Sequence, residues 1–194
     1  MGKDVYEKIR WDNIQYLIAF HCAPVLAGIK ISNLLVTDNE GAMDVNKLLD
    51  GTKIEVYELS RLRGKVVLLL FNRCKLAEYL GDKTNAHFLR SLGHNKLDVT
   101  SVLKELACRY SDYERGVASF PHELGIVLGY PVGDVYGFMA NDGQNYILSG
   151  YWKVYSRADK ARDTFRAYDD CTENIMRALI SGNNLTDIVG VCAV

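Results

Sequence analysis

The sequence lacks features that would each indicate a class of protein. Its 194 residues carry 23 basic and 24 acidic side chains, so it has no basic excess of the kind that nucleic-acid-binding domains show. No apolar run approaches the ~20 residues of a membrane-spanning helix, and the longest, at residues 66–71, suits a buried strand. Only three prolines occur, and no stretch is of low complexity, which argues against disorder. The composition favours neither a nucleic acid nor a membrane as partner.

Metal-binding and nucleotide-binding signatures are also missing. Five cysteines are widely spaced along the chain, at positions 22, 74, 108, 171 and 192. No Cys-x-x-Cys pair occurs, so neither a zinc ribbon nor a thioredoxin-type site is supported, and we predict no metal site. No glycine-rich phosphate loop occurs either, and the sequence therefore names no cofactor. Because the first residues are polar and lack an apolar leader, we interpret the cysteines as free thiols in a reducing cytoplasm.

The apolar periodicity predicts an α+β fold, a single domain over residues 1–194 with a small mixed or antiparallel sheet packed against several helices. Strands are expected near residues 34–37, 54–59, 66–71 and 146–155. Helices are expected at residues 73–80, 85–92, 99–110, 121–129, 131–140 and 156–180, besides one near the start. Pro24 predicts a break in that first helix near residues 21–23. Residues 183–194 are interpreted as a C-terminal tail, ordered or frayed.

The segment from 121 to 140 has the spacing of a helix-turn-helix. Apolar residues are placed to hold two short helices together, and Gly129 falls in the turn. The second helix carries Asp134 and has no Arg, Lys or Gln with which to contact DNA. We therefore interpret the segment as a helix-turn-helix-like corner, and DNA binding is the least favoured function.

Three segments carry distinctive motifs. They read His-Cys-Ala-Pro-Val-Leu-Ala-Gly-Ile-Lys from residue 21, Phe-Pro-His-Glu-Leu-Gly from residue 120 with Leu-Gly-Tyr-Pro from residue 128, and Gly-Tyr-Trp-Lys-Val-Tyr from residue 150. In order and spacing they resemble a clostridial family catalogued as domain of unknown function 3793, and the resemblance spans nearly the whole chain. It implies a bacterial, anaerobic source and implies no mechanism.

The pair His122-Glu123 is the first candidate for chemistry. Behind Pro121 it is expected in the first turn of a helix, where free backbone N–H groups attract anions. His122 is suited to act as a general base or ligand that Glu123 orients. The structural alternative is that Glu123 caps the helix and His122 bonds to a neighbouring loop. A zinc site of the His-Glu-x-x-His type is excluded because Ile126 occupies the second histidine position.

Cys22 is the second candidate. A cysteine with a histidine elsewhere in the chain permits a thiol nucleophile and a base, and His122 is one such histidine. Cys22 is expected near the C-terminal end of a helix, however, where the helix dipole raises the pKa of a thiol. A buried structural cysteine is therefore the alternative.

The expected strand at 146–155 is rich in aromatic residues. Alternation along it places Tyr151, Lys153 and Tyr155 on one face and Trp152 on the other. An aromatic face that carries a lysine is suited to stack a planar ligand, and the alternative is a half-buried strand whose rings pack under helices. The ligand-binding candidates in these motifs are His21, Lys30, Tyr130, Tyr151, Trp152, Lys153 and Tyr155.

Two functions remain after these exclusions. The first is a cytoplasmic binding or regulatory module that takes a small molecule or a protein partner near the His122 helix. It rests on distinctive aromatic and polar motifs without a complete catalytic set. The second is a hydrolase or transferase that uses His122 with Glu123 or Cys22.

Overall fold

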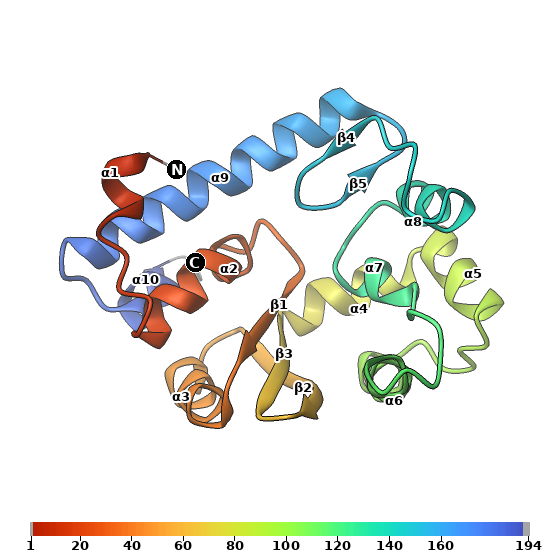
Figure 1. Ribbon diagram of the computed structural model, residues 1–194, viewed down its shortest axis with the longest axis horizontal. Coiled ribbons are helices and arrows are strands. Elements are labelled where there is room, and N and C mark those ends of the chain that lie inside the picture. The colour runs from red at the N-terminus through yellow and green to blue at the C-terminus, as the bar shows by residue number, and fades with distance from the viewer. Residues whose placement is uncertain (1, 192–194) are drawn as a thin grey trace. The chain divides into compact units, whose positions relative to one another are not determined.

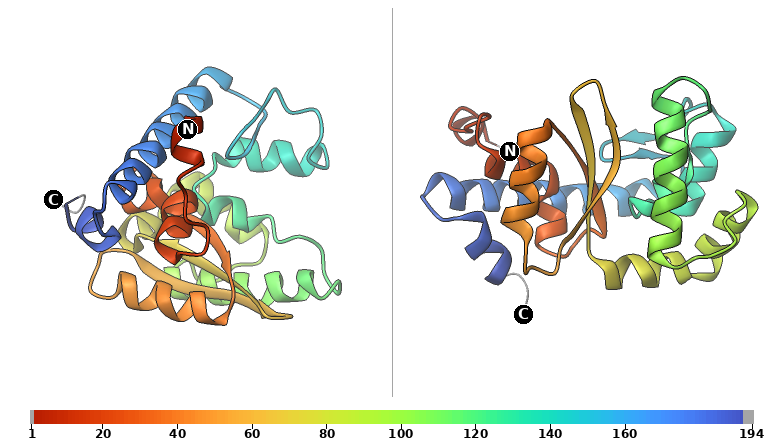
Figure 2. Two further views of the ribbon diagram at one scale, coloured as in Figure 1. Left: turned by 60° about the vertical axis from the view of Figure 1, so that its left-hand side comes forward. Right: turned by 90° about the horizontal axis from the view of Figure 1, so that it is seen from below.

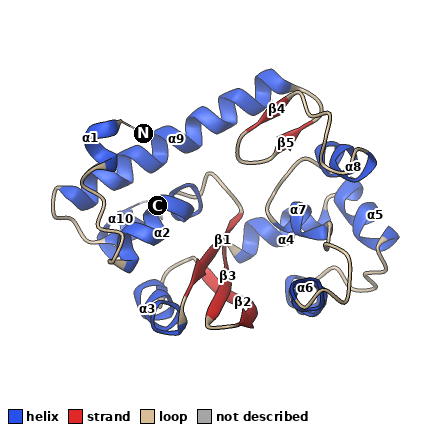
Figure 3. Cartoon of the chain, in the orientation of Figure 1, coloured by secondary structure: helices blue, strands red, loops and turns tan. Residues whose placement is uncertain are grey.

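The computed structural model describes residues 2–191 and confirms an α+β fold (Figure 1). Figure 3 separates its helices from its few strands. The described residues form two compact units. Unit 1 runs to Arg73 and resumes at Tyr168, and unit 2 comprises Cys74–Ala167. The expectation of a single domain over residues 1–194 stays a prediction.

The sheet of unit 1 has three antiparallel strands in the order β1-β3-β2. These are β1 (Ser32–Thr37), β2 (Glu55–Leu62) and β3 (Lys65–Phe71). The central strand β3 is buried from Val66 to Phe71, which accounts for its unbroken apolar run. A two-residue turn joins β2 to β3, and both of its residues, Arg63 and Gly64, have positive φ, the conformation that such hairpins require. The expected hairpin is confirmed.

Helices cover this sheet and form the core of unit 1. They are α1 (Lys3–Tyr6), α2 (Ile14–Leu26), α3 (Asn39–Leu49), the later part of α9 (Ala158–Ile180) and α10 (Leu185–Val191). Helix α2 contacts β1, and α3 contacts β2 and β3. In Figure 2, α3 is the orange helix beside the strands. Ile18 of α2, Val45 of α3 and Leu68 of β3 are buried in one apolar cluster with Met176 of α9.

The predicted break in the first long helix is wrong. Helix α2 runs through residues 21–23 and includes Pro24 near its end. A proline so close to the C-terminus removes only one hydrogen bond of the last turn. The carbonyl of Pro24 still accepts hydrogen bonds from the N–H groups of Ile29 and Lys30, which hold the chain as it leaves the helix.

Unit 2 is mainly helical. Its elements are α4 (Arg73–Gly81), α5 (Lys83–Ser91), α6 (Val99–Glu114), α7 (Glu123–Val127), α8 (Val132–Ala140), β4 (Leu148–Ser149), β5 (Lys153–Val154) and the first part of α9. The helix-turn-helix-like corner is confirmed, with α7 and α8 in contact and Gly129 at positive φ between them. Helix α7 is shorter than expected and begins at Glu123, with His122 at its N-cap position.

The single strand expected at residues 146–155 is wrong. The chain instead reverses and forms two antiparallel two-residue strands, β4 and β5. The reversal occurs from Gly150 to Trp152, and the ring of Phe165 lies 2.3 Å from where a Cβ on Gly150 would stand. A glycine inside a strand pattern is a signal for such a bend. The alternation that placed Tyr151, Lys153 and Tyr155 on one face of that strand and Trp152 on the other is therefore wrong as well.

The C-terminal segment is ordered as far as the structure describes it. Helix α9 ends before Gly182, which has positive φ as a helix-terminating glycine. Helix α10 follows, and Leu185 and Val189 are buried in the core of unit 1. Most of the expected tail at 183–194 is therefore a packed helix, while residues 192–194, with Cys192, lie outside the described residues. Among residues 2–191, no helix combines the length and apolarity that a membrane span requires.

Candidate functional site

A cavity of about 260 Å³ lies in unit 2, where α7, α8 and the β4–β5 segment meet. Its walls are almost wholly apolar. Four of the lining residues are aromatic, and a histidine lines it as well. The lining residues are Phe120, His122, Leu124, Gly125, Leu128, Tyr130, Asp134, Val135, Phe138, Trp152 and Lys153. An apolar hollow with a few polar groups is the usual form of a small-molecule site.

The close approach of α7 to α8 depends on Gly125. A Cβ at this position would stand 2.8 Å from Cγ2 of Val135, nearer than side chains pack. Val135 is β-branched and has little rotameric freedom in a helix with which to move away. Gly125 therefore allows the two short helices to pack at the distance that forms one wall of the cavity.

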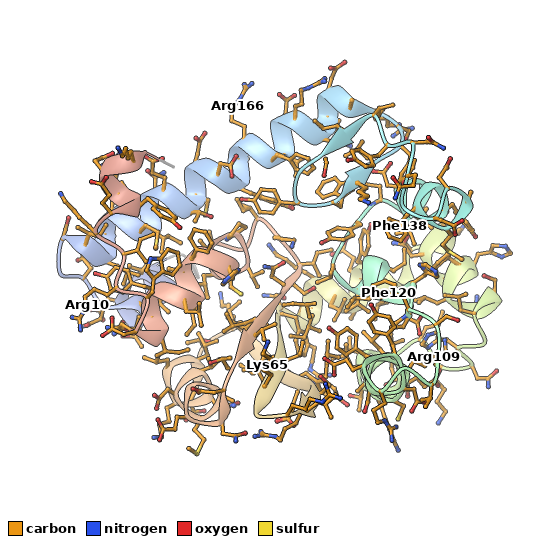
Figure 4. All side chains as sticks on the ribbon, viewed as in Figure 1. Arg10, Lys65, Arg109, Phe120, Phe138 and Arg166 are labelled. Atoms are coloured by element: carbon orange, nitrogen blue, oxygen red, sulfur yellow. The ribbon has the colours of Figure 1, made fainter. Side chains whose placement is uncertain are left out.

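His122 stands at the cavity between two aromatic rings. Its ring centroid lies 5.6 Å from that of Phe120 and 5.9 Å from that of Phe138. Figure 4 labels both phenylalanines. The structural alternative for His122, a hydrogen bond to a neighbouring loop, is not what the structure shows. Within the described residues 2–191 the imidazole contacts rings and takes part in no hydrogen bond or ion pair.

Trp152 and Tyr130 form an aromatic pair at the cavity, and Asp134 fixes the tryptophan. The two rings stack at 5.4 Å with an interplanar angle of 27°. Nε1 of Trp152 donates a 2.8 Å hydrogen bond to Oδ2 of Asp134. Oδ1 of Asp134 accepts hydrogen bonds from the backbone N–H groups of Tyr155, at 2.9 Å, and Ser156, at 3.2 Å. This buried carboxylate thereby ties the first turn of α8 to the segment that carries Trp152.

Lys153 supplies the cationic group at the cavity. Its Nζ donates a 2.5 Å hydrogen bond to the carbonyl oxygen of Gly143. The same nitrogen lies 5.6 Å from the ring centroid of Phe138 and 5.0 Å from that of Tyr146. Both distances are within the range of cation–π attraction. The ammonium group is thus held beside the aromatic wall by three neighbours.

Glu123 belongs to a buried charged cluster and does not face His122. Its Oε1 accepts a 2.8 Å hydrogen bond from Nη1 of Arg109 and lies 3.5 Å from Nε2 of His94. Nδ1 of the buried His94 lies 2.9 Å from Oε2 of Glu105. Burial alone would raise the pKa of the Glu123 carboxyl. His94, the local backbone and the Arg109 charge outweigh it and hold that pKa below its ordinary value.

This cluster changes the interpretation of the His122-Glu123 pair. Glu123 does not orient His122, because its carboxylate contacts Arg109, His94 and the backbone of its own residue. Sequence reasoning missed Arg109, which Figure 4 labels, and His94 as well. Arg109 lies on α6, Glu123 on α7 and His94 in the loop between α5 and α6, and no local pattern in the sequence signals their meeting.

Two of the remaining ligand-binding candidates lie next to the cavity without lining it. The ring of Tyr151 packs against Phe165 at 5.6 Å. The ring of Tyr155 covers Gly137, where a Cβ would stand 2.4 Å from its Cγ. Both rings therefore have packing roles, as the alternative interpretation of this segment expected.

The first motif lies in unit 1 and is built around buried groups. Cys22 is fully buried, and burial raises the pKa of its thiol to about 12. Lys30 is 4% exposed, and burial lowers the pKa of its ammonium to about 8. Its Nζ donates a hydrogen bond to Oδ1 of Asn33. Nδ2 of Asn33 in turn donates one to the backbone carbonyl of the exposed His21. A thiol so protonated and enclosed has the environment of a packing residue.

The described residues include no group of three His, Cys, Asp or Glu side chains arranged to hold a metal ion. The cysteines at positions 22, 74, 108 and 171 form no disulfide bond. The polar side chains that line the cavity are those of His122, Tyr130, Asp134 and Lys153.

A family comparison covers the cavity and most of the rest of the chain. The family model described as "Protein of unknown function (DUF3793)" matches residues 18–189. The chain belongs to this family. The match includes all three motifs and every residue that lines the cavity. No curated protein and no solved structure matches the chain. For this member of the DUF3793 family the function must therefore be inferred from the site itself.

Proposed function

We propose that this DUF3793 protein is a binding module that holds a small, largely apolar ligand in the aromatic cavity of unit 2. The observation that carries the proposal is the cavity itself, at which His122, Tyr130, Trp152 and Lys153 meet. A dry apolar cavity of about 150 Å³ holds benzene. The volume here, about 260 Å³, is therefore suited to two fused rings.

The state of the polar groups favours binding over the hydrolase or transferase alternative. Such an enzyme needs a nucleophile or a base paired with a second group. Here the carboxylates of Asp134 and Glu123 are occupied by other donors, and the thiol of Cys22 is buried with a raised pKa. His122 has ring contacts alone, which suit it to contact a bound ligand.

The remaining parts of the proposal follow from sequence features. The cysteines of the described residues form no disulfide bond, which suits a reducing cytoplasm. A bacterial, anaerobic source and a regulatory role stay predictions. The same holds for a protein partner and for the absence of nucleic-acid binding.

The neutral bicyclic amide 2-naphthamide is a suitable first probe, measured by isothermal titration calorimetry. We expect one probe molecule to bind per chain. His122→Ala is expected to weaken binding about fivefold, because it removes one aromatic contact worth about 1 kcal/mol. The same change should lower the free energy of unfolding by less than about 1 kcal/mol, since no hydrogen bond of the side chain is lost.

His87 provides the matched control, because it is an exposed histidine on α5. His87→Ala should leave both the affinity and the stability unchanged within error. The proposal is contradicted if 2-naphthamide fails to bind the wild-type protein. It is also contradicted if the His122 and His87 variants bind the probe equally well.

A further inference from the structure

We propose that the ligand is an aromatic anion, with a carboxylate or phosphate on a planar ring system, and that Lys153 binds its anionic group. This inference rests on the proposed function and specifies the chemistry of its ligand. It follows from the polar groups at the cavity, from the surroundings of Lys153, and from the arrangement of the aromatic rings.

The polar groups that remain at the cavity favour an acceptor on the ligand. Asp134 is the one carboxylate among the lining residues, and its two oxygens already accept three hydrogen bonds. Nε1–H of Trp152 is occupied by that same carboxylate. The charged side chains of the lining are Asp134 and Lys153, and of these the ammonium of Lys153 keeps donors for a ligand. An ammonium donates hydrogen bonds and accepts none.

The position of Lys153 is fixed by Gly143. This glycine has a φ of +69°, and a Cβ there would stand 2.9 Å from Cε2 of Phe138 and 3.3 Å from Nζ of Lys153. Because Gly143 has no Cβ, its backbone carbonyl can come close to the ammonium group of Lys153. One carbonyl uses one of three N–H donors. The ammonium is therefore oriented while it keeps donors for a further acceptor.

The aromatic residues complete the inference. Tyr130 and Trp152 present stacked rings, and Phe138 lies under the ammonium group of Lys153. A ligand with a flat ring packs against these surfaces by offset or edge contacts. Its anionic substituent then lies at the Phe138 side, where Lys153 provides a charge-assisted hydrogen bond. A neutral amide on the same ring system gains the ring contacts and offers Lys153 an uncharged carbonyl acceptor, which forms the weaker hydrogen bond.

The test compares three probes that share one ring system, each titrated by calorimetry into the wild-type protein. They are 2-naphthamide, 2-naphthoate and 2-naphthyl phosphate. We expect the better of the two anions to bind about tenfold more tightly than the amide, the factor that one charge-assisted hydrogen bond gives. The identity of that anion distinguishes a carboxylate ligand from a phosphate ester.

Lys153→Met should remove the preference for the anion, because it weakens the binding of the anions more than the binding of 2-naphthamide. Lys153→Arg should retain the preference, and it serves as the second variant if the methionine protein is poorly folded. Lys160 on α9 is an exposed lysine, and Lys160→Met should change nothing.

Two results would overturn the inference while the proposed function stands. One is equal binding of the amide and both anions by the wild-type protein. The other is a Lys153→Met protein that keeps the preference for the anion. Failure of 2-naphthamide to bind would instead contradict the proposed function itself.

Discussion

Asp134→Ala is expected to lower the free energy of unfolding by about 4 kcal/mol. The substitution leaves Nε1–H of Trp152 and the backbone N–H groups of Tyr155 and Ser156 without their acceptor. Asp134 is 4% exposed, so water does not readily replace it. Hydrogen bonds to a charged group contribute about 1.5–3 kcal/mol each, and the losses overlap because the three bonds share one side chain. Urea denaturation followed by circular dichroism measures the change.

Asp134→Asn and Trp152→Phe separate the contributions. Asparagine keeps the size of the side chain but directs an NH₂ group at N–H donors, so we expect a loss of about 2–3 kcal/mol. Trp152→Phe removes one donor and leaves the hydrogen bonds from the backbone to Asp134 intact. We expect it to lower the free energy of unfolding by about 1–1.5 kcal/mol, in addition to the effect of the smaller ring. An Asp134→Ala protein as stable as the wild type would contradict the assignment of Asp134 as the residue that ties α8 to Trp152.

Glu123→Gln is expected to lower the free energy of unfolding by about 2 kcal/mol at neutral pH. It removes the buried one of the two carboxylates that face Arg109 and His94, and the more exposed Glu105 remains. Removing one partner of a fully buried pair costs about 3–5 kcal/mol, and the partly exposed Arg109 reduces this cost. The experiment is urea denaturation of both proteins at a series of pH values.

The pH dependence has a definite sign. The pKa of Glu123 is lower in the folded protein than in the unfolded chain, so the carboxylate stabilises the fold above the unfolded pKa of about 4.3. That contribution is lost as the pH falls through the lower folded pKa. The stability difference between the wild type and Glu123→Gln should therefore be full near pH 7 and shrink in acid.

Asp112→Asn is the matched control for the charge change, because Asp112 forms an exposed ion pair with Arg115. Exposed pairs contribute about 0–1 kcal/mol, so little change is expected at any pH. A stability difference for Glu123→Gln that grows in acid would contradict the assignment, as would an effect equal to that of Asp112→Asn.

Much of the fold could be predicted because it depends on local patterns. The apolar run at 66–71 predicted the buried strand, and Gly64 favours the turn before it because glycine accepts positive φ without steric cost. The predicted helix break and the predicted single strand were wrong because the effect of a residue depends on its position in the element as well as on its residue type. Pro24 is tolerated because it lies in the last turn of α2, and aromatic residues near 150 favour a strand that Gly150 bends back.

The candidate site could be predicted in part. Motif residues His122, Tyr130, Trp152 and Lys153 line one cavity, although their roles as ligand-binding residues stay predictions. The sequence indicates that Asp134 needs a hydrogen-bonding partner, because it is an acidic residue on a short apolar helix and a buried carboxylate is costly without one.

The charged cluster beneath α7 could not be predicted. His94, Arg109 and Glu123 are separated by many residues, and the charge of each is unremarkable alone. The packing of α6, α7 and the loop after α5 brings them together, and nothing local in the sequence encodes that packing. The sequence places His122 next to Glu123, whereas the Glu123 carboxylate contacts Arg109 and His94.

The central claim is that the cavity beside His122 binds a ligand, and the two tryptophans of the chain provide a direct test. Titration of ¹⁵N-labelled protein with 2-naphthamide can be followed at the two indole N–H signals, assigned with a Trp11→Phe variant. Trp152 lines the cavity, whereas Trp11 lies in unit 1 against Tyr6 and Phe20. We predict that the Trp152 signal shifts to saturation while the Trp11 signal stays fixed. A Trp152 signal that stays fixed, or equal shifts of both signals, would contradict the account.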